Sequence, residues 1–198
     1  GETWSPFNLT IEDLEDVAFL GRQVGLIVGD EGLIFRTANG GQNWSQVASG
    51  TRSSLRAVEF GTRGRAYAAG DDGVILRSTD DGESWSVVET GTVRWEGLFG
   101  VDELRAYVVG RGGNIKVSGN GGASWSDQGS GTTSDLKDVY FTGLSDGWAV
   151  GQNDLALHTS NGGSSWAARD AGINLGLDGV NFVSADEGWV VGNAGAVY

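Results

Sequence analysis

The sequence predicts an all-β fold: a single five-bladed β-propeller with four antiparallel strands in each blade. Tryptophan recurs at positions 4, 44, 85, 125 and 166, so that successive spacings are 40, 41, 40 and 41 residues. The segments between the tryptophans are short, rich in β-branched and aromatic residues, and separated by glycine, which indicates strands joined by tight turns. A repeat near 40 residues with four strands is typical of a propeller blade.

Each tryptophan ends a turn phrase, Ser/Thr-x-Asp/Asn-x-Gly-x-x-Trp, whose fullest copy occupies residues 78–85. The Asp or Asn side chain accepts hydrogen bonds from backbone N–H groups of the turn, and the glycine adopts a positive φ. The hydroxyl residue ties the two strands together, and the tryptophan packs beneath the turn. We therefore expect structural roles for Asn39, Asp80, Asn120, Asn161, Trp44, Trp85, Trp125 and Trp166.

Two further markers recur in every unit and divide it into strands. One is an apolar triplet that ends in glycine, and the other is Leu-x-x-Val-x-Phe. The third unit departs from the second marker, with Trp95 in place of the leucine. The first unit then contains strands at about Leu14–Leu20, Val24–Val28, Leu33–Arg36 and Asn43–Ala48. The turn between the second and third strands uses glycine for its dihedral angles. In the fourth unit Asp154 replaces that glycine, and we expect it to adopt the left-handed conformation.

The unbroken repeat predicts one domain over residues 1–198. Its blades span about 11–50, 51–91, 92–131 and 132–172, and the fifth combines 173–198 with 1–10. Trp4 stands at the end of a turn phrase, while the chain ends within the third strand of its fifth unit. We therefore expect Glu2–Phe7 to pair antiparallel with Ala196–Tyr198, so that the ring closes as a monomer without exposed strand edges.

The three markers in fixed order resemble the repeat of photosystem II stability/assembly factors and their bacterial relatives. The phrase Gly-Trp-Ala-Val-Gly at 147–151 and the Ser-Gly-Thr segments at 49–51 and 130–132 carry the same resemblance. It covers essentially the whole chain. It implies a propeller that binds protein and that is exported to the periplasm or the extracellular space. Photosynthetic members are described as seven-bladed, whereas the markers in this chain suffice for five.

Composition excludes several classes of partner and cofactor. A net charge of −13 and a pI near 4.3 argue against binding to nucleic acid or to an anionic membrane surface. No run of eighteen apolar residues is present, so we expect no membrane insertion. Without cysteine and with His158 as the single histidine, zinc sites and Ser-His-Asp triads are not expected. We expect no cofactor and no metal.

The acidic side chains do not indicate an enzyme. Asp80 and Asp81 suggest a glycosidase, but one Asp of the phrase is used by its own turn and Asn replaces it in three units. An Asn side chain cannot act as a general acid. Tyr67 and Tyr107 stand at an apolar repeat position and are expected in the core. The acidic cluster Glu12, Asp13, Glu15 and Asp16 is interpreted as a solvated start of the first strand.

Three functions remain open from the residues alone. The first is a non-enzymatic interaction module that binds a protein or peptide segment, and the second is a carbohydrate-binding propeller with quasi-equivalent grooves. The third is an excised or engineered propeller without a selected ligand. Connectivity places the turns between second and third strands beside the connections between blades, on a rim where the units differ. An acidic arc facing a basic one on this rim would orient a charged peptide. The candidate rim residues are Arg52, Arg94, Arg111, Asp30, Glu31, Asp71 and Asp72, and Trp95 is excluded because it fills a buried leucine position.

Overall fold

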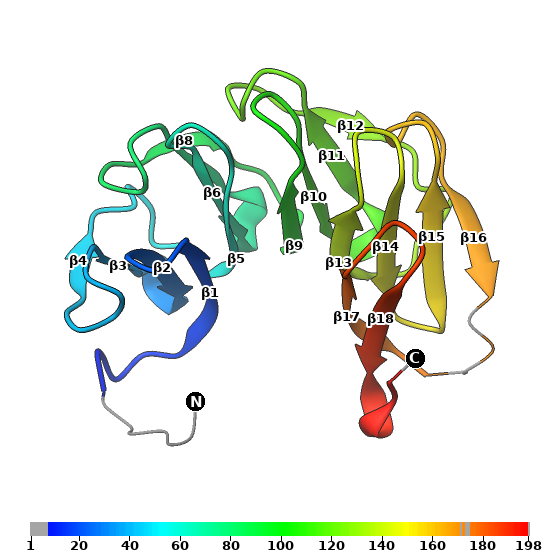
Figure 1. Ribbon diagram of the computed structural model, residues 1–198, viewed down its shortest axis with the longest axis horizontal. Coiled ribbons are helices and arrows are strands. Elements are labelled where there is room, and N and C mark those ends of the chain that lie inside the picture. Colours follow the sequence, from blue (N-terminus) through cyan, green and yellow to red (C-terminus); the bar gives the residue numbers. More distant parts are fainter. Residues whose placement is uncertain (1–7, 171, 173–174, 198) are drawn as a thin grey trace.

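The computed structural model describes residues 8–170, 172 and 175–197, and in these residues the protein is all-β apart from single-turn 3-10 segments. Four antiparallel sheets contain four strands each, and a fifth sheet contains two. Figure 1 shows the sheets arranged side by side in an arc around a central space. None of the described helical segments is long and apolar enough to cross a membrane.

The strands of each sheet follow one another in sequence order from the centre of the arc to its outside. The first two sheets contain β1 (Leu14–Leu20), β2 (Val24–Gly29), β3 (Ile34–Thr37), β4 (Ser45–Val47), β5 (Leu55–Phe60), β6 (Ala66–Gly70), β7 (Ile75–Ser78) and β8 (Ser86–Glu89). The next two contain β9 (Trp95–Gly100), β10 (Ala106–Gly110), β11 (Ile115–Ser118), β12 (Ser126–Gln128), β13 (Leu136–Phe141), β14 (Gly147–Gly151), β15 (Leu155–Thr159) and β16 (Ala167–Asp170). The fifth contains β17 (Leu177–Phe182) and β18 (Gly188–Gly192).

The inner strands β1, β5, β9, β13 and β17 contact one another in succession and line the central space. In Figure 1 the two ends of the arc, β1 and β17–β18, do not meet. The predicted pairing of Glu2–Phe7 with Ala196–Tyr198 involves residues 1–7 and 198, which lie outside the described residues. The observed architecture is therefore a propeller-like arc of sheets.

The apolar core lies between neighbouring sheets. The marker residues Leu55 and Val58 of β5 are 0% and 3% exposed. Tyr67 and Tyr107 are fully buried, which confirms their predicted place in the core. Trp95 is 1% exposed, so it fills the buried leucine position of its unit, as predicted. Burial of such side chains between sheets is the main stabilising term of this fold.

The faces at the two ends of the arc are less covered than the internal ones. On β1, Val17 is 56% and Phe19 is 46% exposed, although Val58 at the equivalent place on β5 is 3% exposed. On β18, Trp189 and Val191 are 44% and 46% exposed. These end faces therefore present the apolar side chains that each internal blade buries against its neighbour.

The turns between second and third strands lie beside the connections between blades, as predicted from the connectivity. The Gly73 N–H donates to the Val93 carbonyl oxygen at 2.6 Å, and the Asp71 N–H donates to Ser54 at 2.9 Å. Three-residue 3-10 segments form four of these turns, at η1 (Asp30–Gly32), η2 (Asp71–Gly73), η3 (Arg111–Gly113) and η4 (Asn193–Gly195). In the fourth unit Asp154 has φ 61°, which confirms the left-handed conformation expected there.

The tryptophan turns lie on the opposite rim, beside the loops between first and second strands. The Gly40 N–H donates to the Gln23 carbonyl oxygen at 2.8 Å, and the second, third and fourth units repeat this bond. Among the four turn tryptophans only Trp125 is buried, at 7% exposure, whereas the other three are partly buried. The tryptophan is therefore buried in the third unit and partly covered in the other three.

Candidate functional site

The structure gathers four of the predicted rim residues into one network of ion pairs. Arg94, Arg111, Asp30 and Asp71 all take part in it. They come from the 3-10 turns η1, η2 and η3 and from the connection into β9. The network continues into the inner strands through Glu15, Arg56, Glu96 and Lys137.

One end of this network is basic. Glu96 of β9 has a side chain that is only 9% exposed, and its Oε1 forms ion pairs with three basic side chains. Arg94 Nε lies at 3.1 Å, Arg111 Nε at 3.2 Å and Lys137 Nζ at 3.3 Å from that oxygen. A single carboxylate cannot neutralise three positive charges, so this end keeps a local excess of positive charge. Arg111 is the outermost of the three, with a side chain 52% exposed.

The other end is acidic and has the reverse arrangement. Arg56 of β5 pairs with Glu15 of β1 and lies 3.4 Å from Asp30 and 3.1 Å from Asp71. Three carboxylates surround one guanidinium, so this end keeps a local excess of negative charge. The fork of donors on arginine suits contact with several carboxylates at once.

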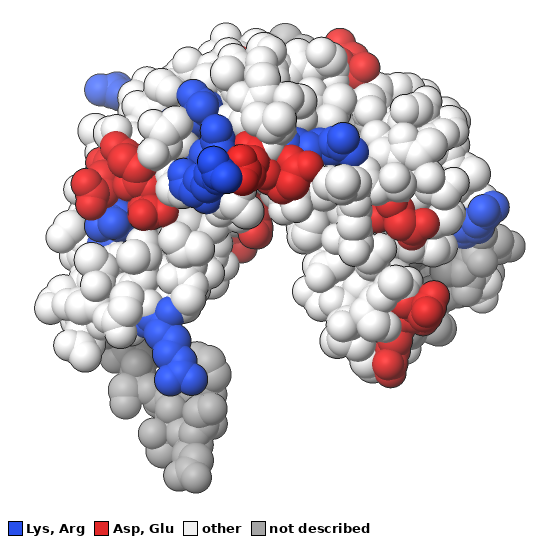
Figure 2. All heavy atoms as spheres, turned by 45° about the horizontal axis from the view of Figure 1, so that its top comes forward, with Lys and Arg blue, Asp and Glu red and all other residues white. Residues whose placement is uncertain are grey.

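Asp71 joins the two ends, because its Oδ1 lies 3.3 Å from Arg94 Nε. The network contains four basic and four acidic side chains, namely Arg56, Arg94, Arg111, Lys137, Glu15, Asp30, Asp71 and Glu96. It is neutral overall but polarised along the rim. Figure 2 shows basic and acidic side chains next to one another on one face of the arc, between broad uncharged areas.

The remaining three predicted rim residues lie outside this network. Arg52 and Glu31 line a shallow hollow of about 430 Å³ at the first blade. Within the part of the chain that the structure describes, neither of them forms an ion pair. Asp72 instead accepts a hydrogen bond from the Ser53 hydroxyl at 2.8 Å.

Sequence reasoning missed the inner-strand members of the network, although a signal for them was present. The residue directly after the leucine of Leu-x-x-Val-x-Phe is charged in all five units. These residues are Glu15, Arg56, Glu96, Lys137 and Asp178. Their charges alternate from blade to blade, and the structure places all five along the central space.

The acidic cluster at the start of β1 is not simply solvated, which corrects the interpretation given above. Asp16 Oδ2 accepts the Val58 N–H of the next blade at 2.8 Å, and its Oδ1 accepts the Val17 N–H. Asp138 repeats the arrangement in the fourth blade with the Val180 N–H at 2.9 Å. Burial raises the pKa of both carboxyls, that of Asp138 to about 6, against the opposing effect of these hydrogen bonds.

The Asp80 side chain of the second turn phrase is hydrogen-bonded within its own turn. Asp80 Oδ1 accepts the Ser84 N–H at 2.9 Å, and its carboxylate also accepts the hydroxyls of Ser84 and Ser78. These bonds, with that of the Ser84 hydroxyl the largest cause, lower the pKa of Asp80 to about 2. A carboxylate held this firmly in its ionised form is unsuited to act as a general acid near neutral pH.

A carbonyl oxygen of each following turn phrase accepts a side-chain donor from the preceding blade. In the first two blades the donor is arginine: Arg36 Nε donates to Asp81 at 2.9 Å, and Arg77 Nε donates to Gly121 at 2.6 Å. In the third blade the Tyr107 hydroxyl donates to Gly162 at 2.8 Å instead. The second blade also contains a tyrosine at this place, and the hydroxyl of Tyr67 is buried without a hydrogen-bond partner among the described residues.

The surface hollows in which a carbohydrate could bind lack the aromatic side chains that are common in sugar-binding sites. Besides the hollow at the first blade, the third blade forms an equivalent hollow of about 630 Å³ beside Ser130–Thr133. Polar side chains, glycine and a few aliphatic residues line both, and no aromatic ring is among their lining residues. Sugar rings are commonly held against aromatic faces, which these hollows lack. Within the described ranges, no group of three or more His, Cys, Asp or Glu side chains is placed to hold a metal ion.

Comparison with known proteins places the chain in a family. The family model described as photosynthesis system II assembly factor YCF48 matches residues 1–132 and 122–198, which together span the whole chain. The chain belongs to this YCF48 family. A search of curated proteins finds no match.

Solved structures similar to this YCF48-family protein support the propeller fold. YCF48 from Cyanidioschyzon merolae is 20% identical with a TM-score of 0.74, over 98% of this chain and 68% of that one. A structure of YCF48 bound to D1 peptide is 15% identical with a TM-score of 0.52, over 96% and 93% of the two chains. An ancestral GH74 enzyme is 17% identical with a TM-score of 0.71, over 94% of this chain and 31% of that enzyme. At these identities the likeness shows the fold alone.

Proposed function

We propose that this YCF48-family protein is a non-enzymatic interaction module that binds a peptide segment of another protein on the rim formed by η1, η2 and η3. The polarised ion-pair network carries the proposal. Its basic end at Glu96 and its acidic end at Arg56 would favour one orientation of a charged segment over the other. The family match and the YCF48 structure with a D1 peptide support a protein partner.

The proposed binding residues follow from the network. Arg94 and Arg111 would contact acidic groups of the partner, and Asp30 and Asp71 would contact basic groups. Arg52, Glu31 and Asp72 lie on the same rim and would extend the surface at the first two blades. Such partly exposed charges act mainly on association rate and specificity, so binding should weaken as salt increases.

The test measures binding of a D1 peptide by fluorescence anisotropy at low and high salt. Replacing Arg94, Arg111 and Lys137 together with Gln should lower the affinity about tenfold or more and flatten the salt dependence. The matched control is Arg22→Ser, because Arg22 lies beside the tryptophan turn on the opposite rim. Equal binding by the triple variant and the natural protein, with circular dichroism unchanged, would exclude this rim as the site.

A glycan array run on the same preparations tests the alternative of a carbohydrate-binding propeller. Strong glycan signals that survive the triple substitution would replace the proposal. Binding of neither the D1 peptide nor any glycan would favour the third alternative, a propeller without a selected ligand.

We also propose that the arc closes as a five-bladed monomer, with the segments 1–10 and 173–198 forming the fifth blade. Closure would cover Val17 and Phe19 at one end and Trp189 and Val191 at the other, all of which are exposed in the described arc. Light scattering should then give a monomeric mass, and an electron microscopy class average should show five blades. Deletion of residues 1–8 should lower the unfolding temperature, and an unchanged temperature would contradict closure.

A further inference from the structure

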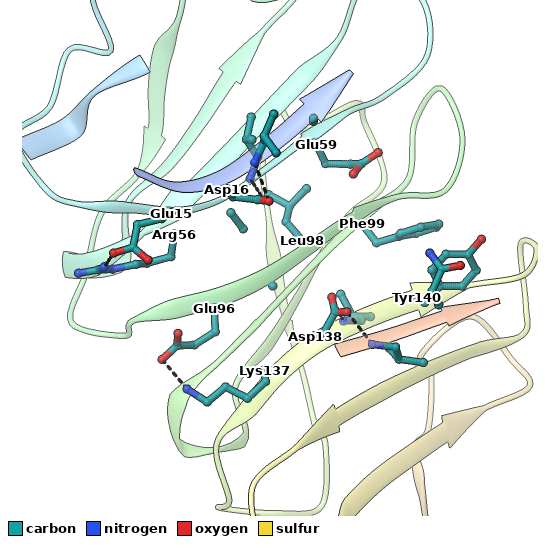
Figure 3. A pocket seen from close by; sticks show the side chains of 18 of the residues that line it. Glu15, Asp16, Arg56, Glu59, Glu96, Leu98, Phe99, Lys137, Asp138 and Tyr140 are labelled. Atoms are coloured by element: carbon teal, nitrogen blue, oxygen red, sulfur yellow. Dashed lines mark hydrogen bonds and ion pairs between the residues drawn. The ribbon is translucent and has the colours of Figure 1, made fainter. Parts of the chain in front are cut away.

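The inner strands surround a cavity of about 530 Å³ in the central space of the arc (Figure 3). Because the strands share one register, equivalent residues of the five units line this cavity in three levels. The first level is the charged one already described. The second contains Asp16, Ala57, Gly97 and Asp138, while the equivalent residue of the fifth unit, Gly179, is not among the lining residues. The third contains Ala18, Glu59, Phe99, Tyr140 and Asn181.

Most charges of the first two levels are compensated within the protein. In the first level Arg56 pairs with Glu15, and Lys137 pairs with Glu96. In the second level the carboxylates of Asp16 and Asp138 each accept two backbone N–H groups. Among the carboxylates of these two levels, Asp178 alone has no donor from the described residues, and its side chain is exposed to solvent.

The third level differs, because its single carboxyl group is partly buried and has no such compensation. Across the described residues, Glu59 makes no hydrogen bond or ion pair through its side chain. Burial, together with the nearby carboxylates of Asp16 and Asp138, raises the pKa of Glu59 to about 7. With no positive partner beside it, the Glu59 carboxyl group is costly to ionise, and a cation bound next to it would stabilise the ionised form.

Two aromatic rings complete this level. The rings of Phe99 and Tyr140 lie with centroids 4.6 Å apart at an angle of 46°. The Tyr140 hydroxyl donates to the Phe182 carbonyl oxygen at 3.0 Å, which fixes the orientation of its ring. In Figure 3 both rings and the Glu59 carboxyl lie on the same side of the cavity, away from the ion pairs of the first level. Aromatic faces attract cations, most strongly where water is partly excluded.

We propose that the third level of this cavity binds a cationic group, an alkylammonium or a guanidinium, with Glu59 as its counter-ion and the rings of Phe99 and Tyr140 as its wall. The site lies on the inner strands and is separate from the binding rim. Its ligand is either a free organic amine or a basic side chain of a protein partner, since both present the same group.

The charge balance predicts how binding depends on pH. A bound cation favours the ionised form of Glu59, so affinity should increase as the pH rises through about 7. The groups that face Glu59 across the cavity are Asp16 on β1, Asp138 on β13 and Asp178 on β17, with Arg56 on its own strand and Glu96 and Lys137 beyond. Asp138, whose pKa is raised to about 6, ionises at slightly lower pH and also increases the affinity for a cation as the pH rises.

The experiment titrates the protein with n-butylammonium and, separately, with a capped lysine-containing tripeptide, followed by NMR or calorimetry at about pH 6 and about pH 8. n-Butanol is the neutral control ligand. The site is supported if either cationic probe binds more tightly at the higher pH and if n-butanol binds more weakly than the cationic probe. Binding of the amine identifies a small-molecule source, and binding of the tripeptide alone identifies a side chain of a partner.

Two variants test the named residues. Glu59→Gln keeps the shape and should lower affinity for the cationic probe about tenfold and remove most of the pH dependence, leaving the smaller part due to Asp138. Phe99→Leu should lower affinity severalfold without changing the pH dependence. Glu187→Gln, an exposed position at the β17–β18 turn, is the matched control and should bind as the natural protein does.

Three results would overturn the proposal. They are absence of binding by both cationic probes, equal binding of n-butanol and n-butylammonium, and equal affinity of Glu59→Gln and the natural protein. Circular dichroism of each variant, recorded under the same conditions, shows whether it is folded when it is titrated.

Discussion

Replacing Glu59 with Gln should change how the stability of the protein depends on pH. Burial and the carboxylates of Asp16 and Asp138 raise the pKa of Glu59 from 4.5 to about 7 in the folded protein. The folded state therefore holds this proton more tightly than the unfolded state does. The contribution of the neutral carboxyl group is fully present below about pH 4.5 and is lost as the pH rises through about 7.

The size of the effect follows from the difference between these two pKa values. A difference of one pH unit corresponds to about 1.4 kcal/mol, so a rise from 4.5 to about 7 corresponds to about 3 kcal/mol above neutral pH. This is an upper figure, because part of the side chain remains accessible to water. The uncharged Gln lacks this penalty, so the variant should be more stable than the natural protein by up to about 3 kcal/mol at pH 8 and by less than about 1 kcal/mol at pH 5.

Urea unfolding of both proteins at several pH values between about 5 and 8 measures this difference directly. Glu187→Gln serves as the control, since that exposed side chain should leave the pH profile unchanged. Asp138→Asn is a useful companion, because its raised pKa of about 6 acts in the same direction at lower pH. If Glu59→Gln leaves the difference in unfolding free energy between pH 5 and pH 8 unaltered, the carboxyl group is not desolvated and the reasoning fails.

Three further predictions concern stability and can be measured by urea unfolding. Tyr107→Phe should lower the free energy of unfolding by about 1–2 kcal/mol, because it removes an inter-blade hydrogen bond. Tyr67→Phe should leave it unchanged or raise it, since that hydroxyl is buried without a hydrogen-bond partner among the described residues, and equal losses in the two variants would contradict this contrast. Trp125→Ala should lower the free energy of unfolding by about 3–5 kcal/mol and Trp85→Ala by clearly less, because Trp125 is buried and Trp85 is only partly buried. The reverse order would refute the burial argument. Gly70→Ala should cost at least about 2 kcal/mol, because the added Cβ would lie 2.0 Å from a backbone carbonyl oxygen before β5, and a neutral result would show that the strands can separate there.

The sequence was sufficient to predict the strands because each unit repeats the same residue pattern. The first unit was predicted to contain strands at Leu14–Leu20 and Val24–Val28, and the structure has Leu14–Leu20 and Val24–Gly29. The outer strand is shorter than predicted, at Ser45–Val47, because only these residues pair with β3. Outer strands have one paired edge, so composition specifies their ends less well than it does those of central strands.

The site was predicted less completely, for a physical reason. The rim was inferred from connectivity, which identified Arg94, Arg111 and Asp71 but treated the inner strands as apolar packing elements. Glu96 and Arg56 hold the two ends of the network, and they stand on strands whose alternate residues face the central space. Asp16 could not be assigned from the pattern, because a register shift between Leu14 and Asp16 changes the direction of its side chain.

The shared register of the inner strands has a consequence for how such a protein can change. Every residue that faces the cavity has two coordinates: its place in the marker sets its depth, and its repeat unit sets its angle around the axis. Glu59, for example, shares its depth with Phe99 and Tyr140 and differs from them only in angle. Exchanging whole units within the chain would therefore rotate a binding group around the axis at constant depth, while a substitution within one unit would alter a single sector. Repeats of this kind can change specificity by reordering existing units, with the strand pairing that defines the fold left as it is.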